Sequence, residues 1–118
     1  MNIEKLRKYC LSKNKVTESF PFDNVTLVFK VLDKMFALTN LDGDLSINLK
    51  CSPDKVVELR EKQNAVKPGY HMNKNHWNTI EIDGTIDDNL IKSWIDDSYA
   101  LVVSKMSKIK QQELEIIK

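Results

Sequence analysis

Residues 26–51, TLVFKVLDKMFALTNLDGDLSINLKC, decide the fold of this chain. Apolar and polar side chains alternate in three runs, which are residues 26–31, 35–41 and 45–51. A period of two residues is typical of a β-strand with one buried face. Residues 32–34 leave room for a tight connection, and Asp42-Gly43-Asp44 is a turn signal because glycine takes positive φ without steric cost. Three strands joined by two short turns predict an antiparallel meander.

The alternation gives the predicted meander one apolar and one polar face. The first strand turns Leu27, Phe29 and Val31 to the apolar side, and the second is expected to contribute Phe36 and Leu38. The apolar positions of the third strand are Leu45, Ile47, Leu49 and Cys51. The polar face carries Lys30, Ser46, Asn48 and Lys50, which suit contact with water or a ligand.

Helices and further strands are predicted before and after the meander in the sequence. The helices are expected at residues 2–13, 53–63, 87–103 and 108–116, and strands at 16–19 and 77–83. Ser52-Pro53-Asp54 is a helix start, since serine caps and proline suits the first helical position. The predicted fold is a single α+β domain, residues 1–118, in which helices pack on one face of an antiparallel sheet of four to five strands.

The composition is that of a soluble globular protein. Of the 118 residues, 42% are hydrophobic and 30% are charged, and the net charge of +1 gives no overall attraction to nucleic acid or anionic membrane. No run of about 18 apolar residues occurs, so we expect no contact with a membrane interior. Without a signal peptide, Cys10 and Cys51 are expected to be reduced thiols in a cytoplasmic protein.

Residues 68–79, PGYHMNKNHWNT, are the part of the chain that packing explains least well. They contain both histidines, one of the two tryptophans, three asparagines and a lysine, and no acidic residue lies between Glu61 and Glu81. Lysine neutralises phosphate, asparagine and histidine reach phosphate or base edges, and aromatic rings stack on unpaired bases. The alternative is structural: Tyr70 and Trp77 cap the core while the histidines hydrogen-bond their own loop.

Catalytic and metal sites are not predicted. Nucleophilic catalysis needs a nucleophile beside an oriented base, and His71 and His76 are the available imidazoles without a recognisable nucleophile motif. A metal site requires more ligands than these two histidines supply at close spacing. We therefore expect a non-enzymatic protein without a metal or other cofactor.

The chain resembles the MmcQ/YjbR family of small bacterial proteins along its whole length. The resemblance rests on Phe20-Pro21-Phe22, on LVFKV at 27–31 followed by KMFAL at 34–38, on INLKC at 47–51, on the helix with Leu90-Ile91 and Ser98-Tyr99, and above all on residues 68–79. It implies a CyaY-like α+β fold, a monomer, and DNA binding through a double-wing surface.

The resemblance also implies which residues would contact DNA. The matching positions are Asn48, Lys50, Lys67, Tyr70, His71, Asn73, Lys74, His76 and Trp77. The acidic turn Asp42-Gly43-Asp44 departs from this role, because a wing placed there would repel phosphate. Two readings remain besides DNA binding: a small-molecule or protein-binding module that uses the same surface, and a metal-handling role that rests on fold analogy alone.

Overall fold

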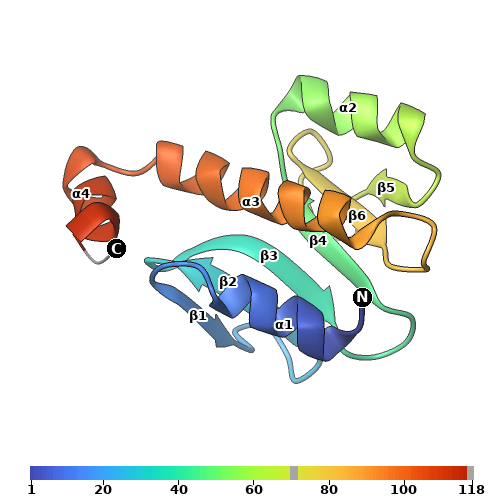
Figure 1. Cartoon of the computed structure of the whole chain (residues 1–118), viewed down its shortest axis with the longest axis horizontal. Coiled ribbons are helices and arrows are strands. Elements are labelled where there is room, and N and C mark those ends of the chain that lie inside the picture. Colours follow the sequence, from blue (N-terminus) through green and yellow to red (C-terminus); the bar gives the residue numbers. More distant parts are fainter. Residues whose placement is uncertain (70–71, 117–118) are drawn as a thin grey trace.

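An antiparallel sheet forms the centre of the molecule in the computed structural model, which describes residues 1–69 and 72–116, with side chains to residue 114 (Figure 1). Six strands pair in the order β1-β2-β3-β4-β6-β5 within the described part of the chain. They are β1 Val16–Ser19, β2 Thr26–Val31, β3 Lys34–Asn40, β4 Ser46–Lys50, β5 Val66–Pro68 and β6 Trp77–Glu81. The predicted meander is confirmed as the run of β2, β3 and β4.

The predicted strand number was too low because β5 was missed. Val66, Lys67 and Pro68 pair with Ile80, Thr79 and Asn78 of β6, where the sequence indicated a simple break after a helix. Proline removes a backbone donor, so it fits a strand at the edge of a sheet, where one side needs no partner. A three-residue edge strand that ends in proline has too short a pattern to recognise.

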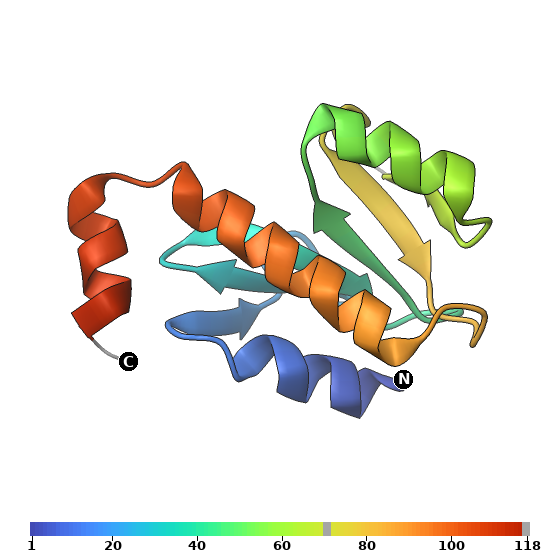
Figure 2. The ribbon, with the colours of Figure 1, turned by 45° about the horizontal axis from the view of Figure 1, so that its top comes forward.

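Four helices are described, α1 Ile3–Leu11, α2 Pro53–Lys62, α3 Asp88–Ser104 and α4 Lys108–Ile116. Figure 2 shows α3 crossing over β3 and β4, with α1 and α2 on the same side of the sheet. We call this covered side the inner face. Asn2 caps α1 by accepting from Lys5 N at 2.8 Å, and Asp87 caps α3 by accepting from Asn89 N at 2.7 Å. Among the described residues, no helix has both the length and the apolar character needed to cross a bilayer.

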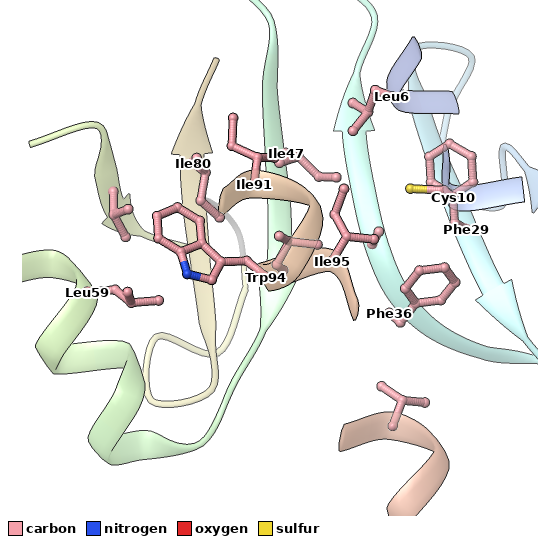
Figure 3. Close-up of a cluster of buried hydrophobic side chains, with 14 of the residues drawn as sticks. Leu6, Cys10, Phe29, Phe36, Ile47, Leu59, Ile80, Ile91, Trp94 and Ile95 are labelled. Atoms are coloured by element: carbon pink, nitrogen blue, oxygen red, sulfur yellow. The ribbon is translucent and has the colours of Figure 1, made fainter. Parts of the chain in front are cut away.

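The main hydrophobic core lies between the inner face and the helices. Ile91, Trp94 and Ile95 project from α3 toward the strands, and Ile47 and Ile80 face them from the sheet (Figure 3). Both cysteines are free thiols; Cys10 is fully buried and Cys51 is partly buried.

A β-bulge interrupts the pairing of β2 with β3. Phe29 pairs with Ala37 but Lys30 pairs with Met35, so Phe36 is the extra residue. Consequently Phe36 and Ala37 both enter the main core, and Leu38 points to the opposite face. The expectation that Phe36 and Leu38 share the inner face was wrong, because the inserted residue reverses the alternation beyond it.

Ser98 of α3 bridges β3 and β4 next to the bulge. Its hydroxyl donates to the carbonyl oxygen of Phe36 at 2.6 Å and accepts from the backbone N–H of Lys50 at 2.9 Å. The side chain is fully buried, so these two backbone groups have no access to water as a substitute. One hydroxyl therefore joins α3 to two strands.

We expect Ser98→Ala to lower the free energy of unfolding by about 2–4 kcal/mol, because two buried backbone groups lose their partner. Urea denaturation measures the change. Ser104→Ala is the matched control: its hydroxyl also bonds a carbonyl, that of Leu101, but on the exposed end of the same helix. Equal losses in both variants would contradict the bridging role.

Candidate functional site

The face of the sheet opposite the helices, which we call the outer face, gathers part of the predicted site. Strand pairing places Lys50 beside Trp77, Asn48 beside Thr79, and Thr79 beside Lys67. These residues alternate with the core positions of their strands and therefore share one face. Asn48, Lys50, Lys67 and Trp77, four of the nine predicted contact residues, come together there.

Trp77 is packed on the outer face rather than presented to solvent. Its side chain forms a second hydrophobic cluster with Val28 and Leu38, against which Met35 and Met72 pack. Trp77 is 7% exposed, which leaves little ring surface for stacking. The packing of Trp77 therefore agrees with the structural alternative, in which this residue is part of a hydrophobic cluster, although the cluster is separate from the main core.

Gly69 allows the segment after β5 to lie close to this tryptophan. A Cβ atom at residue 69 would approach the Cβ and the carbonyl oxygen of Trp77 to 2.8 Å, closer than non-bonded atoms come. The backbone N–H of Gly69 donates to that same carbonyl at 3.0 Å. The glycine is therefore required by close approach and not by a turn.

Arg60, at the end of α2, fastens the segment that leads into β6. Its guanidinium donates to the carbonyl oxygens of Lys74 and Trp77, the latter at 3.1 Å, and its Nε donates to Asn78 Oδ1 at 2.7 Å. Asn78 is 1% exposed and donates in turn to the carbonyl of Val56 at 3.2 Å. Sequence reasoning missed this pair. An asparagine at an inward position of an apolar strand was the available signal, because a buried amide needs partners.

Two further predicted residues bond within their own segment. Lys74 Nζ donates to the carbonyl of Gly69 at 3.3 Å, and Asn73 Oδ1 accepts from the backbone N–H of Asn75 at 2.9 Å. Both side chains remain exposed, whereas His76 is half-buried. Tyr70 and His71 lie outside the described residues.

Charge on the outer face is divided between its two ends. Lys30 of β2 and Lys50 of β4 lie toward one end, and Glu81 of β6 lies toward the other, near the acidic turn that includes Asp44. Within residues 1–69 and 72–114, none of Lys30, Lys50 and Lys67 forms a salt bridge. The same part of the chain holds no group of three metal-ligating side chains.

Comparison with known proteins agrees with this architecture. A family model described as YjbR matches residues 11–101. The chain belongs to the YjbR family. The uncharacterised protein YjbR of Escherichia coli K12 is 32% identical over 97% of this chain and 98% of its own length. The Bacillus subtilis protein YyaQ is 37% identical over 64% of this chain and 63% of its own.

Solved structures share the fold of this YjbR-family chain. The crystal structure of the Deinococcus radiodurans protein DR2400 has a TM-score of 0.90 and 40% identity, over 97% of this chain and 88% of that one. A Pseudomonas syringae protein has a TM-score of 0.76 and 31% identity, over 86% of this chain and 99% of its own. The predicted family is thus confirmed.

We expect Arg60→Lys to destabilise the protein by about 1–3 kcal/mol, because lysine cannot reproduce the guanidinium fork that bonds three acceptors. Hydrogen exchange should also accelerate at the amide of Trp77, which bonds Asn73 O at 3.0 Å in the fastened segment. Urea denaturation and amide exchange measure the two effects.

The chain offers a matched control in Arg7, its other arginine, which pairs with Glu18 on the surface. Exposed ion pairs contribute little, so Arg7→Lys should change stability less and leave the Trp77 amide unaffected. Unchanged exchange in Arg60→Lys would show that Arg60 does not hold the segment.

Proposed function

We propose that this protein is a monomeric, cytoplasmic and non-catalytic module that binds DNA through the outer face. One observation carries the proposal: the helices pack on the inner face, while three lysines without salt-bridge partners in the described chain stand on the opposite face. These are Lys30, Lys50 and Lys67. A cationic surface that meets phosphates explains this placement, since unpaired cations release the counterions of DNA when they bind.

The spacing of the lysines suits a row of phosphates. They stand on β2, β4 and β5, and in the sheet order each is two strands from the next. Neighbouring strands lie about 4.8 Å apart, so the lysines span about 20 Å across the sheet. Phosphates follow one another every 3.4 Å along the axis of each DNA strand, so this span corresponds to about six base pairs.

The polar side chains between these lysines supply hydrogen bonds to the same ligand. Asn48 Oδ1 accepts from the hydroxyl of Thr79, which leaves the amide N–H groups of Asn48 to donate outward. Lys74 and Asn73 add exposed donors from the neighbouring segment. Tyr70, His71 and His76 complete the proposed contact set, and Trp77, the cross-strand neighbour of Lys50, supports it by packing on the outer face.

The acidic end of the outer face gives the complex an orientation. Glu81 and the turn at residues 42–44 repel phosphate, so the duplex is placed toward the end that holds Lys30 and Lys50. With a net charge of +1 the protein has little long-range attraction to DNA, and binding depends on these local contacts. The affinity is therefore modest and steeply dependent on salt.

We expect fluorescence anisotropy with a labelled 20-base-pair duplex to show binding that weakens steeply between 50 and 150 mM salt. Each phosphate contact contributes about 0.9 to the slope of log affinity against log salt. Lys50→Gln and Lys67→Gln should each reduce the slope by about that amount, and Lys74→Ala by a similar amount.

Lys8→Gln is the matched control, because it removes the same charge from exposed α1 on the helical side. If it reduced the slope as much as Lys50→Gln does, the outer face would not be the binding surface. Absence of binding at micromolar protein in low salt would leave the small-molecule or protein-binding alternative for this face.

A further inference from the structure

A cavity of about 230 Å³ lies on the other side of the sheet, between α2, α3 and strands β4 and β6. Its walls are mainly apolar and are formed by Leu49, Leu59, Ile80, Trp94 and Leu101. A dry apolar cavity of about 150 Å³ holds one benzene molecule, so this volume accommodates about nine non-hydrogen atoms. The cavity is thus large enough for a ring with a short chain.

The indole of Trp94 contributes a hydrogen-bond donor to this cavity that the protein leaves unused. Trp94 is 6% exposed, yet its N–H has no partner within residues 1–69 and 72–114. Figure 3 shows the nitrogen-bearing edge of the ring turned toward α2 and Leu59. No buried side-chain nitrogen of the described residues lacks a partner, so this N–H is open to the cavity and can donate to water or to a ligand there.

The start of α2 places positive charge at the same wall. Lys55 lines the cavity and, like Leu59 one turn later, faces it. Side chains four residues apart on a helix have Cβ atoms about 5–6 Å apart, so Lys55 and Leu59 border the same part of the cavity, which Trp94 also lines. Within the described chain Lys55 forms no salt bridge, and Ser52 makes no capping hydrogen bond with its hydroxyl.

Among the described residues that line the cavity, Asp97 is the one acidic residue, and it is exposed to solvent. The thiol of Cys51 also lines the cavity, and its pKa responds to the charged groups around it. Burial raises the pKa of Cys51 to about 11, Arg60 and then Lys55 oppose that shift, and Asp97 adds to it least. Among the described lining residues, Lys50 and Lys55 outnumber the single carboxylate of Asp97, which favours a negatively charged ligand group.

We propose that this cavity binds a small organic acid, with an apolar body between Leu59, Ile80 and Leu101 and a carboxylate that meets Lys55 and accepts from the indole N–H of Trp94. The ligand class follows from the cavity's volume, its apolar walls, the unused donor and the local excess of positive charge. The cavity lies on the inner side of the sheet, although Lys50 of the proposed DNA contacts also lines it, and ligand binding there needs no DNA.

The fluorescence of Trp94 tests the proposal directly. The chain contains two tryptophans, so Trp77→Phe leaves Trp94 as the single reporter. This variant is titrated with 3-phenylpropionate, with its neutral amide and with 3-phenylpropylamine, which share one apolar body and differ in charge. We expect the acid to change the emission and to bind about tenfold more tightly than the amide, and the amine to bind most weakly.

Charge variants then identify the group that selects the acid. Lys55→Met should lower the affinity for 3-phenylpropionate by about tenfold and leave that for the amide unchanged. Lys8→Met removes the same charge from α1, away from the cavity, and should leave both unchanged. Asp97→Asn should leave the acid's affinity equal or higher.

Alkylation of Cys51 in the unmodified chain gives a second readout. It shows whether the cavity binds the acid even if the Trp77→Phe variant does not fold. Cys10 is fully buried, so neutral iodoacetamide at pH 9 reacts first with Cys51. Millimolar 3-phenylpropionate should slow that reaction, and the amide should slow it less. The proposal would be overturned if the acid and the amide bound equally well, or if the amine bound more tightly than the acid. It would also be overturned if millimolar acid neither changed the emission of Trp94 nor slowed the alkylation of Cys51.

Discussion

The hydroxyl of Ser98 is the contact on which both faces of the sheet depend. A shift of one residue along a strand moves its side chains to the other face, and the bulge at Phe36 makes such a shift within β3. That shift sends Leu38 outward, where Trp77 packs on it, and keeps Ala37 in the main core. By bonding the carbonyl of Phe36 and the N–H of Lys50, Ser98 stabilises the bulged arrangement from which the outer face is built.

Arg60 and Asn78 form a second connection, which joins the inner side of the sheet to the segment beside the outer face. Asn78 lines the cavity on the inner face, and its Oδ1 accepts from Arg60. Arg60 also holds the carbonyls of Lys74 and Trp77, which belong to the segment beside the outer face. Three hydrogen bonds of Arg60 thus join a wall of the cavity to the proposed DNA-contacting segment, so a displacement of Asn78 would alter the contacts at both places.

Local sequence patterns predicted most of the helices and strands. The arrangement of the candidate site could not be predicted in this way, because it is set by pairing between residues distant in sequence. The strands from Thr26 to Lys50 and the helix from Pro53 were found within one or two residues, because alternation and capping are local signals. The family was found from residues 68–79. The bulge at Phe36 was missed because an extra residue looks like any other apolar position. β5 has no local signature, and for the Arg60–Asn78 pair the sequence marks only the inward asparagine, because its partner is set by contacts made in the folded chain.

The absence of acids between Glu61 and Glu81 now has a structural cause in addition to the proposed one. The donors of Arg60 are used by two carbonyls and an amide, and a carboxylate nearby would compete for them and release the segment. The same absence leaves Lys67 and Lys74 without close acidic neighbours in sequence. Part of what the sequence indicated as recognition is therefore the requirement of holding a loop against a sheet. The part that we propose for a ligand lies on the strands, in lysines that belong to neither hydrophobic cluster.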